Sequence, residues 1–575
     1  IYANGQPLLI AASQEAGYAE LYIDANRNGI GEPGEEITYL RGSGENGGIF
    51  YREGAGYFLC NSAVYGGAKE GDCQYDTCVT LTGSAENRTV DAVYGGNASG
   101  TLTGNACVNI TGGNVRIVFG GNAGGILTGD TCVKMSGGIA EFVFGGGDGG
   151  ETNGNTSVEV TGGCITNRIV GGNGTGQING STFVSVENAQ VGYVFGGNEV
   201  SGIVTGDTNL VFGDKTLATG WIYGGGAGYS NDVITEVAGS TNITINGGEF
   251  QQNIYGGGGW RGAAVGASNI VINGGSVPYD VYGGGEEQSY VAGKASITVN
   301  GGDVNRIYAS GAGFNNTAAE VGEAAICLNG GKVDWFSALT LEENDKVLIN
   351  GGLSFELSGD SFSDITCWFG FSGHSVSLND VNVAFRNAAV DTCMFYASVR
   401  GSMSLSFDNA YVKSLYLAGN VLRDAEEAAL SYVNCGSEEK SWREQPSLTG
   451  SHLDGNKFTT ILMKDSYMNF KDDSFTTEDN TLRACTEKLI VDGGALRVIG
   501  LMISDMPPTE FRNVPLLLRS GSSEAIHFDE IPVGNARIQW MNDDGTVPAD
   551  KKDRVIAEAP TEAPNRLFAS GYPDY

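Results

Sequence analysis

The chain has 575 residues, with 33 Lys and Arg against 67 Asp and Glu, so its formal net charge is −34. This acidity argues against nucleic acid and anionic lipid as partners, because like charges repel. Glycine occupies 91 positions, yet 41% of the residues are hydrophobic, which excludes a disordered linker. The glycines come in pairs within a long repeat and lack a three-residue period, which excludes collagen. No apolar run of about 20 residues is present, so we expect no membrane insertion.

Residues 1–60 precede the repeat, and we expect them to form an N-terminal capping segment. Within them, DANRNGIGEPGE at positions 24–35 matches the calcium-loop pattern D-x-[DN]-x-[DN]-G-x5-E. The expected ligands are the side chains of Asp24, Asn26, Asn28 and Glu35 and the backbone carbonyl of Ile30. The sequence therefore predicts a structural Ca²⁺ site, and the alternative is a metal-free hairpin turn rich in Asn and Gly.

The stretch 101–150 contains one phrase written twice: LTG-N-ACVNI-TGG-NVRIVFGGN, then LTG-D-TCVKM-SGG-IAEFVFGGG. Each copy offers three short runs with β-branched or aromatic residues, separated by Gly-rich corners, and none has helical spacing. A unit of about 25 residues cannot bury its apolar face alone, so consecutive units must stack. The sequence therefore predicts an all-β fold, a parallel β-helix of about 16 coils of about 25–30 residues, with capping segments at both ends.

The repeat defines the expected domain boundaries. Its aromatic-GG signature begins at residue 61, so the β-helix is expected over 61–520, with Gly-rich coils at 61–355 and coils poorer in Gly at 356–520. In the later coils the predicted corners fall at Asn379, Asp408, Asn434, Asp465 and Asp492. A long polar loop is expected at 436–457, and residues 521–575 lose the repeat and are expected to form the C-terminal cap.

Several residue types recur at one phase of the repeat, so stacking would place them in columns. Cys78, Cys107 and Cys132 share one phase, and we expect a column of buried thiols that behave as small hydrophobic groups. An internal asparagine column follows the GG pairs, at Asn97, Asn122, Asn173 and Asn198. Asp130 and Asp207 occupy the T-G-D corner, where capping of a turn is the expected role.

No catalytic constellation is apparent. Arg116, Arg168 and Arg306 precede the aromatic-GG signature, but no regular acidic companion is evident in the sequence. The three histidines, at 374, 452 and 527, are far apart. Paired carboxylates at adjacent coils, as glycoside hydrolysis requires, are not found. The pattern therefore favours a protein that is not an enzyme.

Ligand binding is expected where irregular segments carry aromatic residues. Two segments place a tryptophan next to an arginine: Trp260 with Arg261, and Trp442 with Arg443. Such a pair on a loop can contact a sugar face or a partner protein. The alternative is that each tryptophan folds back over the edge of a coil.

The repeat (T/N)GG…(V/I)(Y/F)GG(G/N)…TG(D/N) resembles the pectate-lyase-like right-handed β-helix regions of large surface proteins from Gram-positive gut anaerobes. The match is strong over 61–350 and weak over 351–500. The resemblance implies secretion or cell-wall display and contact with a host glycan, a polysaccharide or a host surface protein. It carries over no catalytic residues, because the calcium-binding Asp cluster and the Arg of the lyases are not matched.

We therefore expect an extracellular or cell-surface, non-enzymatic adhesin or binding scaffold. The alternatives are a carbohydrate-active enzyme, such as a polysaccharide lyase or glycoside hydrolase, and a structural subunit that associates end to end.

Overall fold

A computed structural model describes residues 63–499 except for short segments, and strand residues alone outside that range. The excepted segments are 84–89, 229–233, 261–262, 314–318, 340–348, 360–364, 371–376, 420, 438, 441–444, 450–452, 454 and 472–484. The chain divides into two compact units, of which the first runs from Ile1 to Ala324 and the second begins at Ala325. Between residues 63 and 496 lie about 14 turns of right-handed parallel β-solenoid with essentially no helix. The predicted fold is confirmed.

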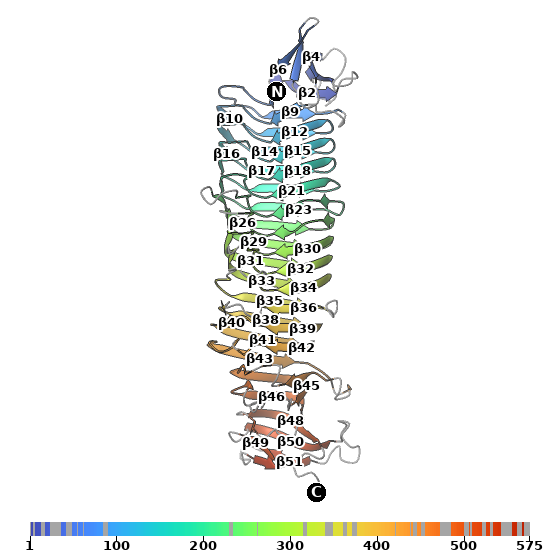
Figure 1. Cartoon of the computed structure of the whole chain (residues 1–575), viewed down its shortest axis with the longest axis vertical. Coiled ribbons are helices and arrows are strands. Elements are labelled where there is room, and N and C mark those ends of the chain that lie inside the picture. The colour runs from blue at the N-terminus through green and yellow to red at the C-terminus, as the bar shows by residue number, and fades with distance from the viewer. Residues whose placement is uncertain are drawn as a thin grey trace. The chain divides into compact units, whose positions relative to one another are not determined.

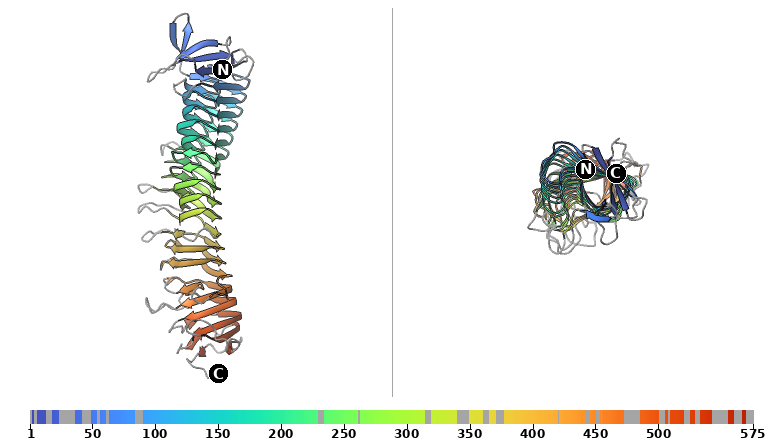
Figure 2. Two further views of the ribbon diagram at one scale, coloured as in Figure 1. Left: turned by 90° about the vertical axis from the view of Figure 1, so that its right-hand side faces the viewer. Right: turned by 90° about the horizontal axis from the view of Figure 1, so that it is seen from above.

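In the first unit, one coil contains three strands, as the doubled stretch 101–150 predicts, and each strand pairs with its equivalent in the next coil (Figure 1). The two copies form β10 (Thr101–Thr103), β11 (Ala106–Ile110) and β12 (Asn114–Phe119), then β13 (Ile126–Thr128), β14 (Thr131–Met135) and β15 (Ile139–Phe144). Equivalent strands pair in parallel, so that each residue lies beside its counterpart in the next coil. In the side view of Figure 2 these coils stack one above the other.

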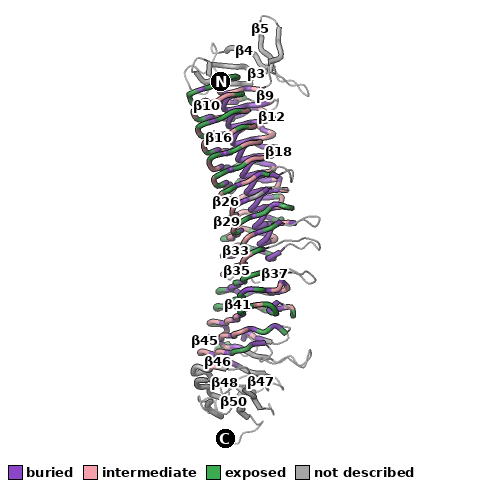
Figure 3. Tube along the Cα trace, turned by 90° about the vertical axis from the view of Figure 1, so that its left-hand side faces the viewer, coloured by how far each residue is buried: buried purple, intermediate pink, exposed green. Residues whose placement is uncertain are grey.

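Alternating burial along each strand fills the interior of the coil (Figure 3). In β11, Ala106, Val108 and Ile110 are fully buried, whereas Cys107 and Asn109 between them are half-buried on the outer face. This is the two-residue period of a strand with one face on the core. The prediction of buried thiols is therefore wrong for this column, because the inward positions belong to Ala106, Val108 and their equivalents.

Aromatic rings form two stacked columns in the first unit. The rings are those of Tyr65, Tyr94, Phe119 and Phe144, then, beyond Val170, those of Phe195, Tyr223, Tyr255, Tyr282 and Tyr308. Neighbouring centroids lie 4.6–5.0 Å apart. Burial raises the pKa of the tyrosines, to about 12 for Tyr94 and Tyr308, so the phenols keep their protons at neutral pH.

The glycine pair after each ring lets adjacent coils approach closely. A Cβ on Gly120 would lie 2.2 Å from the carbonyl oxygen of Gly145 in the next coil. The carbonyl of Gly145 also accepts a 2.6 Å hydrogen bond from the buried hydroxyl of Thr131, across the interior of the coil. The same bond recurs from Thr156 to Gly171 and from Thr182 to Gly196. The carbonyl group at each corner therefore contacts the glycine of the neighbouring coil and is hydrogen-bonded to a threonine of its own coil.

The asparagine column is confirmed, with a change in its partners. Asn97, Asn122, Asn173 and Asn198 are all buried. The side-chain oxygen of Asn122 accepts the backbone N–H of Asn97 at 2.8 Å, and that of Asn198 accepts the N–H of Asn173 at 2.9 Å. The side-chain amides donate to backbone carbonyls of the corner. Each asparagine thus satisfies backbone groups of two coils.

The predicted capping role of the T-G-D corner is also confirmed. The Asp130 carboxylate accepts the backbone N–H of Asn155 at 2.7 Å, and the Asp207 carboxylate accepts that of Ser240 at 2.7 Å. Both bonds cross from one coil to the next, so these side chains are committed to stacking.

In the second unit, β35 (Leu353–Ser358), β38 (Val381–Arg386), β41 (Ser402–Asp408) and β43 (Glu427–Val433) repeat the parallel stacking. Asparagine and aspartate replace glycine at the left-handed corner position: Asn387, Asn409, Asn434 and Asp465 have φ of 47–53°. These residues tolerate that conformation better than other non-glycine residues. The predicted corners at Asn434 and Asp465 are confirmed, and Asn379 lies in the turn between β37 (Ser377–Leu378) and β38. Two predicted corners were one residue early, because the left-handed residues are Asn409 and Gly493 instead of Asp408 and Asp492.

Antiparallel strands accompany the parallel stacks. In the first unit, β2 (Gln6–Ala12) pairs in parallel with β8 (Thr77–Leu81) and antiparallel with β3 (Tyr18–Ile23). In the second unit, β50 (Val533–Met541) pairs antiparallel with β51 (Val555–Ala559). Antiparallel pairing at these positions occupies strand edges that would otherwise remain open to further stacking.

The close approach of the coils predicts the effect of adding one methyl group. We expect Gly120→Ala to lower the free energy of unfolding by about 1–3 kcal/mol, because its Cβ would collide with a backbone carbonyl that cannot move alone. Gly124→Ala is the control, since its Cβ would lie 3.7 Å from the nearest atom, the carbonyl oxygen of Ala98, in ordinary contact. Urea unfolding followed by circular dichroism measures both midpoints. Equal midpoints for the two variants would contradict this account of the GG corner.

Candidate binding face

A strip of aromatic and polar side chains lies on the outer face of the sheet that leads into the aromatic-GG corners. We define the outer strip as the residue two positions before the ring position in seven consecutive coils: Phe142, Arg168, Tyr193, Trp221, Asn253, Asp280 and Arg306. All seven belong to the first unit. The residue after each member, such as Val143 or Val194, is fully buried, so the strip residues lie on the opposite side of the strand. Six of them are partly exposed, and Asp280 is buried.

The strands that present the strip are β15, β18 (Cys164–Val170), β21 (Gln190–Phe195), β30 (Ser276–Tyr282) and β32 (Asp303–Tyr308). Trp221 and Asn253 immediately precede the two-residue strands β25 (Ile222–Tyr223) and β28 (Ile254–Tyr255). Parallel neighbours are about 4.8 Å apart, so six intervals give a strip about 29 Å long. That length suits an extended chain of several sugar units.

Contacts between neighbouring side chains position the residues from Phe142 to Trp221, the N-terminal part of the strip. The guanidinium of Arg168 lies 5.3 Å from the ring centroid of Phe142, a cation–π arrangement. The rings of Tyr193 and Trp221 meet edge to face with centroids 5.7 Å apart. The indole N–H of Trp221 donates to Gln252 at 2.9 Å. The rings of Phe142, Tyr193 and Trp221 are each partly exposed.

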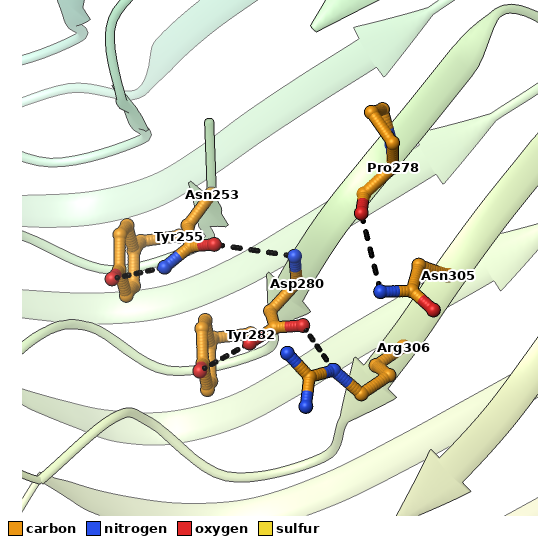
Figure 4. Close-up of polar contacts among 7 residues, drawn as sticks. All are labelled: Asn253, Tyr255, Pro278, Asp280, Tyr282, Asn305 and Arg306. Atoms are coloured by element: carbon orange, nitrogen blue, oxygen red, sulfur yellow. Dashed lines mark hydrogen bonds and ion pairs between the residues drawn. The ribbon is translucent and has the colours of Figure 1, made fainter. Parts of the chain in front are cut away.

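The C-terminal part of the strip, from Asn253 to Arg306, is a hydrogen-bonded polar cluster (Figure 4). The Asp280 carboxylate accepts a 2.6 Å bond from Nε of Arg306 and a 3.1 Å bond from the hydroxyl of Tyr282. The backbone N–H of Asp280 donates to the side-chain oxygen of Asn253 at 3.2 Å, and the amide of Asn253 donates to the hydroxyl of Tyr255. The strip is therefore tied to the buried tyrosine column at two points.

Arg116, Arg168 and Arg306 each have a carboxylate partner, but the partners follow no regular offset along the repeat, as the sequence indicated. Arg168 pairs with Glu199 at 2.5 Å and Arg306 with Asp280 at 2.6 Å. Arg116, which lies one position earlier in its coil than the strip, pairs with Asp91 at 2.7 Å. The partners lie 25–31 residues away, in a neighbouring coil or its corner. Charge on the face is thus locally balanced.

Trp260 is the one predicted ligand-binding residue that lies among the described residues. Its ring is 5.8 Å from that of Phe195 and 5.9 Å from that of Tyr223. The same two rings lie beside Tyr193 and Trp221 of the outer strip. Trp260 therefore packs on the buried ring column, which connects it to the strip through one layer of rings, and its role in binding stays a prediction.

Glu286 is a half-buried residue whose carboxyl group lies beside this ring column. It accepts a 2.5 Å hydrogen bond from the hydroxyl of Tyr223. Burial raises the pKa of Glu286, while hydrogen bonds from Tyr223, the backbone of Trp260 and Tyr255 partly oppose the rise. Through these hydrogen bonds the carboxylate holds the aromatic residues on which the strip packs.

The other predicted ligand-binding residues, Arg261, Trp442 and Arg443, lie outside the described residues, as does the predicted calcium loop from Asp24 to Glu35. Within the described part of the chain, no group of three or more His, Cys, Asp or Glu is arranged to hold a metal ion. No helix in the described part has the length and apolar character needed to cross a membrane.

The 436–457 segment contributes to a shallow groove in the second unit. Its volume is about 350 Å³, and its lining includes Asn387, Asn409, Tyr411, Lys440 and Pro446. The two asparagines are corner residues joined by a 2.8 Å hydrogen bond. The groove shows that the polar loop lies against the corners of neighbouring coils.

Sequence reasoning missed the outer strip, although the signal is present in the printed sequence. When the coils are aligned on their aromatic-GG corners, the position two residues earlier reads F, R, Y, W, N, D, R. The buried position that follows each strip residue is Val or Ile in all seven coils. A varied outward column on a uniform scaffold is the feature that could have located it.

Comparisons of the chain with protein-family models, with curated proteins and with solved structures found no match. The assignment of a function therefore depends on the site itself.

The partly desolvated carboxyl group of Glu286 predicts a pH-dependent stability. Because its folded pKa is raised above the unfolded value of 4.5, the folded chain binds this proton more tightly, and stability falls as pH rises through the folded pKa. We expect the melting temperature of Glu286→Gln, measured relative to the parent protein, to increase between about pH 4.5 and pH 7.

Tyr223→Phe provides the matched test. It removes a hydrogen bond that lowers the pKa of Glu286, so the loss of stability should move to higher pH. A difference between Glu286→Gln and the parent that does not change with pH would contradict the buried position of this carboxylate.

Proposed function

We propose that the chain is a non-enzymatic, secreted or surface-displayed binding scaffold whose outer strip holds an uncharged polysaccharide. The observation that carries the proposal is the row of rings and hydrogen-bonding groups in seven consecutive coils, partly exposed in all of them but that of Asp280. Sugar rings present apolar C–H faces and a rim of hydroxyl groups. Aromatic faces suit the former, and amide and carboxylate groups suit the latter.

The order of the strip supports a polymeric ligand. Phe142, Tyr193 and Trp221 place rings at separate coils along the stack, and Asn253 and Asp280 continue the row with polar groups. A chain lying along the stack would meet these groups in succession. Many shallow contacts then add up without a deep pocket, as expected for a ligand with repeated units.

The charge pattern supports an uncharged ligand. Each arginine of the strip is neutralised by a carboxylate in a short ion pair. The net charge of −34 would repel uronic or sulfated polysaccharides and nucleic acid. A neutral glycan escapes this repulsion and can use the paired charges as hydrogen-bonding groups.

Commitment of the carboxylates supports binding without catalysis. Asp280 is 8% exposed and accepts bonds from Arg306 and Tyr282. Glu199 is held by Arg168. A general acid needs a carboxyl group within hydrogen-bond reach of the ligand, whereas these two carboxylates face arginines of the chain itself.

The proposal keeps three further expectations. Display outside the cell follows from the resemblance of the repeat and from the acidic composition. A Ca²⁺ ion at the loop of Asp24, Asn26, Asn28, Ile30 and Glu35 would have a structural role. Trp260 with Arg261, and Trp442 with Arg443, would contribute contacts outside the strip.

The test measures binding to a panel of neutral and acidic polysaccharides by affinity gel electrophoresis and calorimetry. We expect Trp221→Ala and Tyr193→Ala each to weaken binding to the preferred neutral polysaccharide at least about tenfold, equivalent to about 1.4 kcal/mol. Tyr290→Ala is the control, because Tyr290 is a more exposed ring, 47% accessible, on β31 (Tyr290–Val299) of a different sheet.

Unchanged binding in both strip variants, or a preference for acidic polysaccharides, would overturn the proposed site. Release of new reducing or unsaturated sugar ends during incubation would show that the chain is an enzyme. Unchanged melting temperatures of the variants confirm that a loss of binding does not come from unfolding.

A further inference from the structure

Three cysteines form a column on the outer face of a different sheet. Cys78, Cys107 and Cys132 lie in β8, β11 and β14, and they pair in register, Cys78 with Cys107 and Cys107 with Cys132. All three are free thiols and half-buried. The inward neighbours, such as Val108 and Val133, are fully buried, so the thiols point away from the core.

The spacing of the column does not suit a disulfide. Parallel strands hold equivalent atoms about 4.8 Å apart. A disulfide requires sulfur atoms about 2.05 Å apart and Cβ atoms about 3.8 Å apart. Bonding would therefore require two coils to move together, against the backbone hydrogen bonds that fix their separation. The same spacing is close to two metal–thiolate bonds of about 2.3 Å in line, about 4.6 Å in total.

The surroundings of the column limit the kind of ion. Zinc prefers four ligands, but each gap between neighbouring cysteines offers two sulfur atoms. Among the described residues, no group of three or more His, Cys, Asp or Glu is arranged around a single ion. The near neighbours are Asn109, whose amide donates to the sulfur of Cys78 at 3.3 Å, and Lys134, which pairs with Glu159. Oxygen-preferring ions such as Ca²⁺ or Mg²⁺ do not select thiolates. The remaining class is a soft metal ion that is stable with only two sulfur ligands.

We propose that Cys78, Cys107 and Cys132 form a binding site for a soft monovalent metal ion of the Cu(I) class. One ion lies in each gap between adjacent thiolates, and Cys107 is the ligand shared by both gaps. Each thiol that binds releases its proton to water, and the oxidation state of the metal does not change. The site is independent of the polysaccharide-binding strip, which lies on the other sheet.

A second cysteine pair shows why exposure matters. Cys367 and Cys393 of the second unit also lie in register, but both are fully buried. An ion could reach them only if the coil opened. The exposed column is therefore the one that a metal ion can enter in the folded protein.

The experiment uses the full chain, reduced and kept free of oxygen, and titrated with Cu(I) in the presence of a coloured Cu(I) chelator. We expect the parent protein to withdraw copper from the chelator. Cys107→Ser should lose this copper, and Cys78→Ser and Cys132→Ser should each lose one of the two gaps. Cys164→Ser is the matched control, because Cys164 is a partly exposed thiol that stacks on Ile139 and Gln190 instead of on cysteines.

The proposal is overturned if the chain withdraws no copper, if Cys107→Ser binds as the parent does, or if Cys164→Ser loses binding. It is also overturned if mass spectrometry shows that the thiols lose hydrogen and carry no copper, which would indicate a disulfide. If Cys107→Ser does not fold, as judged by circular dichroism, the single-gap variants decide the outcome. X-ray absorption at the copper edge should show sulfur neighbours alone.

Discussion

The close parallel stacking of the coils is the constraint on which the rest of the structure depends. Backbone hydrogen bonds run from coil to coil in strands and through the corners, as in the bonds from Gly95 to Phe119 and from Gly120 to Phe144. At the GG corners, neighbouring backbones approach so closely that a single methyl group would meet a carbonyl oxygen about 2 Å away. Glycine is abundant for this reason. Once the spacing is fixed, each position of the repeat lies over its equivalent, and columns of like residues follow.

The columns stabilise the stack by different physical means. Stacked rings bury apolar area and keep the offset geometry that aromatic pairs prefer. The asparagines and the T-G-D carboxylates instead satisfy backbone groups that corners leave without a strand partner. Loss of one member affects two interfaces, since each residue contacts the coil before and the coil after. Stability in such a fold is therefore close to a sum over neighbouring coils.

The fold could be predicted from the sequence because the repeat states its period directly. The register of Cys107, the asparagine column and the capping role of Asp130 all follow from aligning one coil with the next. The outward orientation of Cys107 could also have been read, because Val108 and Ile110 must face inward and a strand alternates. The corner at Asn409 was displaced by one residue from the prediction, since Asp408 and Asn409 are both good turn residues and only the backbone conformation separates them.

The ion pairs could not be read in the same way. Arg168 reaches Glu199 in the corner of the next coil, and the strand pairing on both sides of Arg168 contains an irregularity in register. Such a shift moves a side chain relative to its column, so sequence alignment alone does not give its partner. The exposed strip also lacks the chemical uniformity by which the buried columns are recognised. The proposed function depends on the outward positions that the repeat leaves free to vary.

The rigidity of the stack bears on how the strip would bind. Tyr193 and Trp221 lie against the fully buried rings of Phe195 and Tyr223. The ring of Trp260 also packs against these two buried rings. Asn253 and Asp280 are hydrogen-bonded to buried tyrosines. Little conformational freedom is therefore left to lose when a ligand is bound, which reduces the entropic cost of association. A shallow face with weak individual contacts can then bind a long ligand, because its groups are already in place before the ligand arrives.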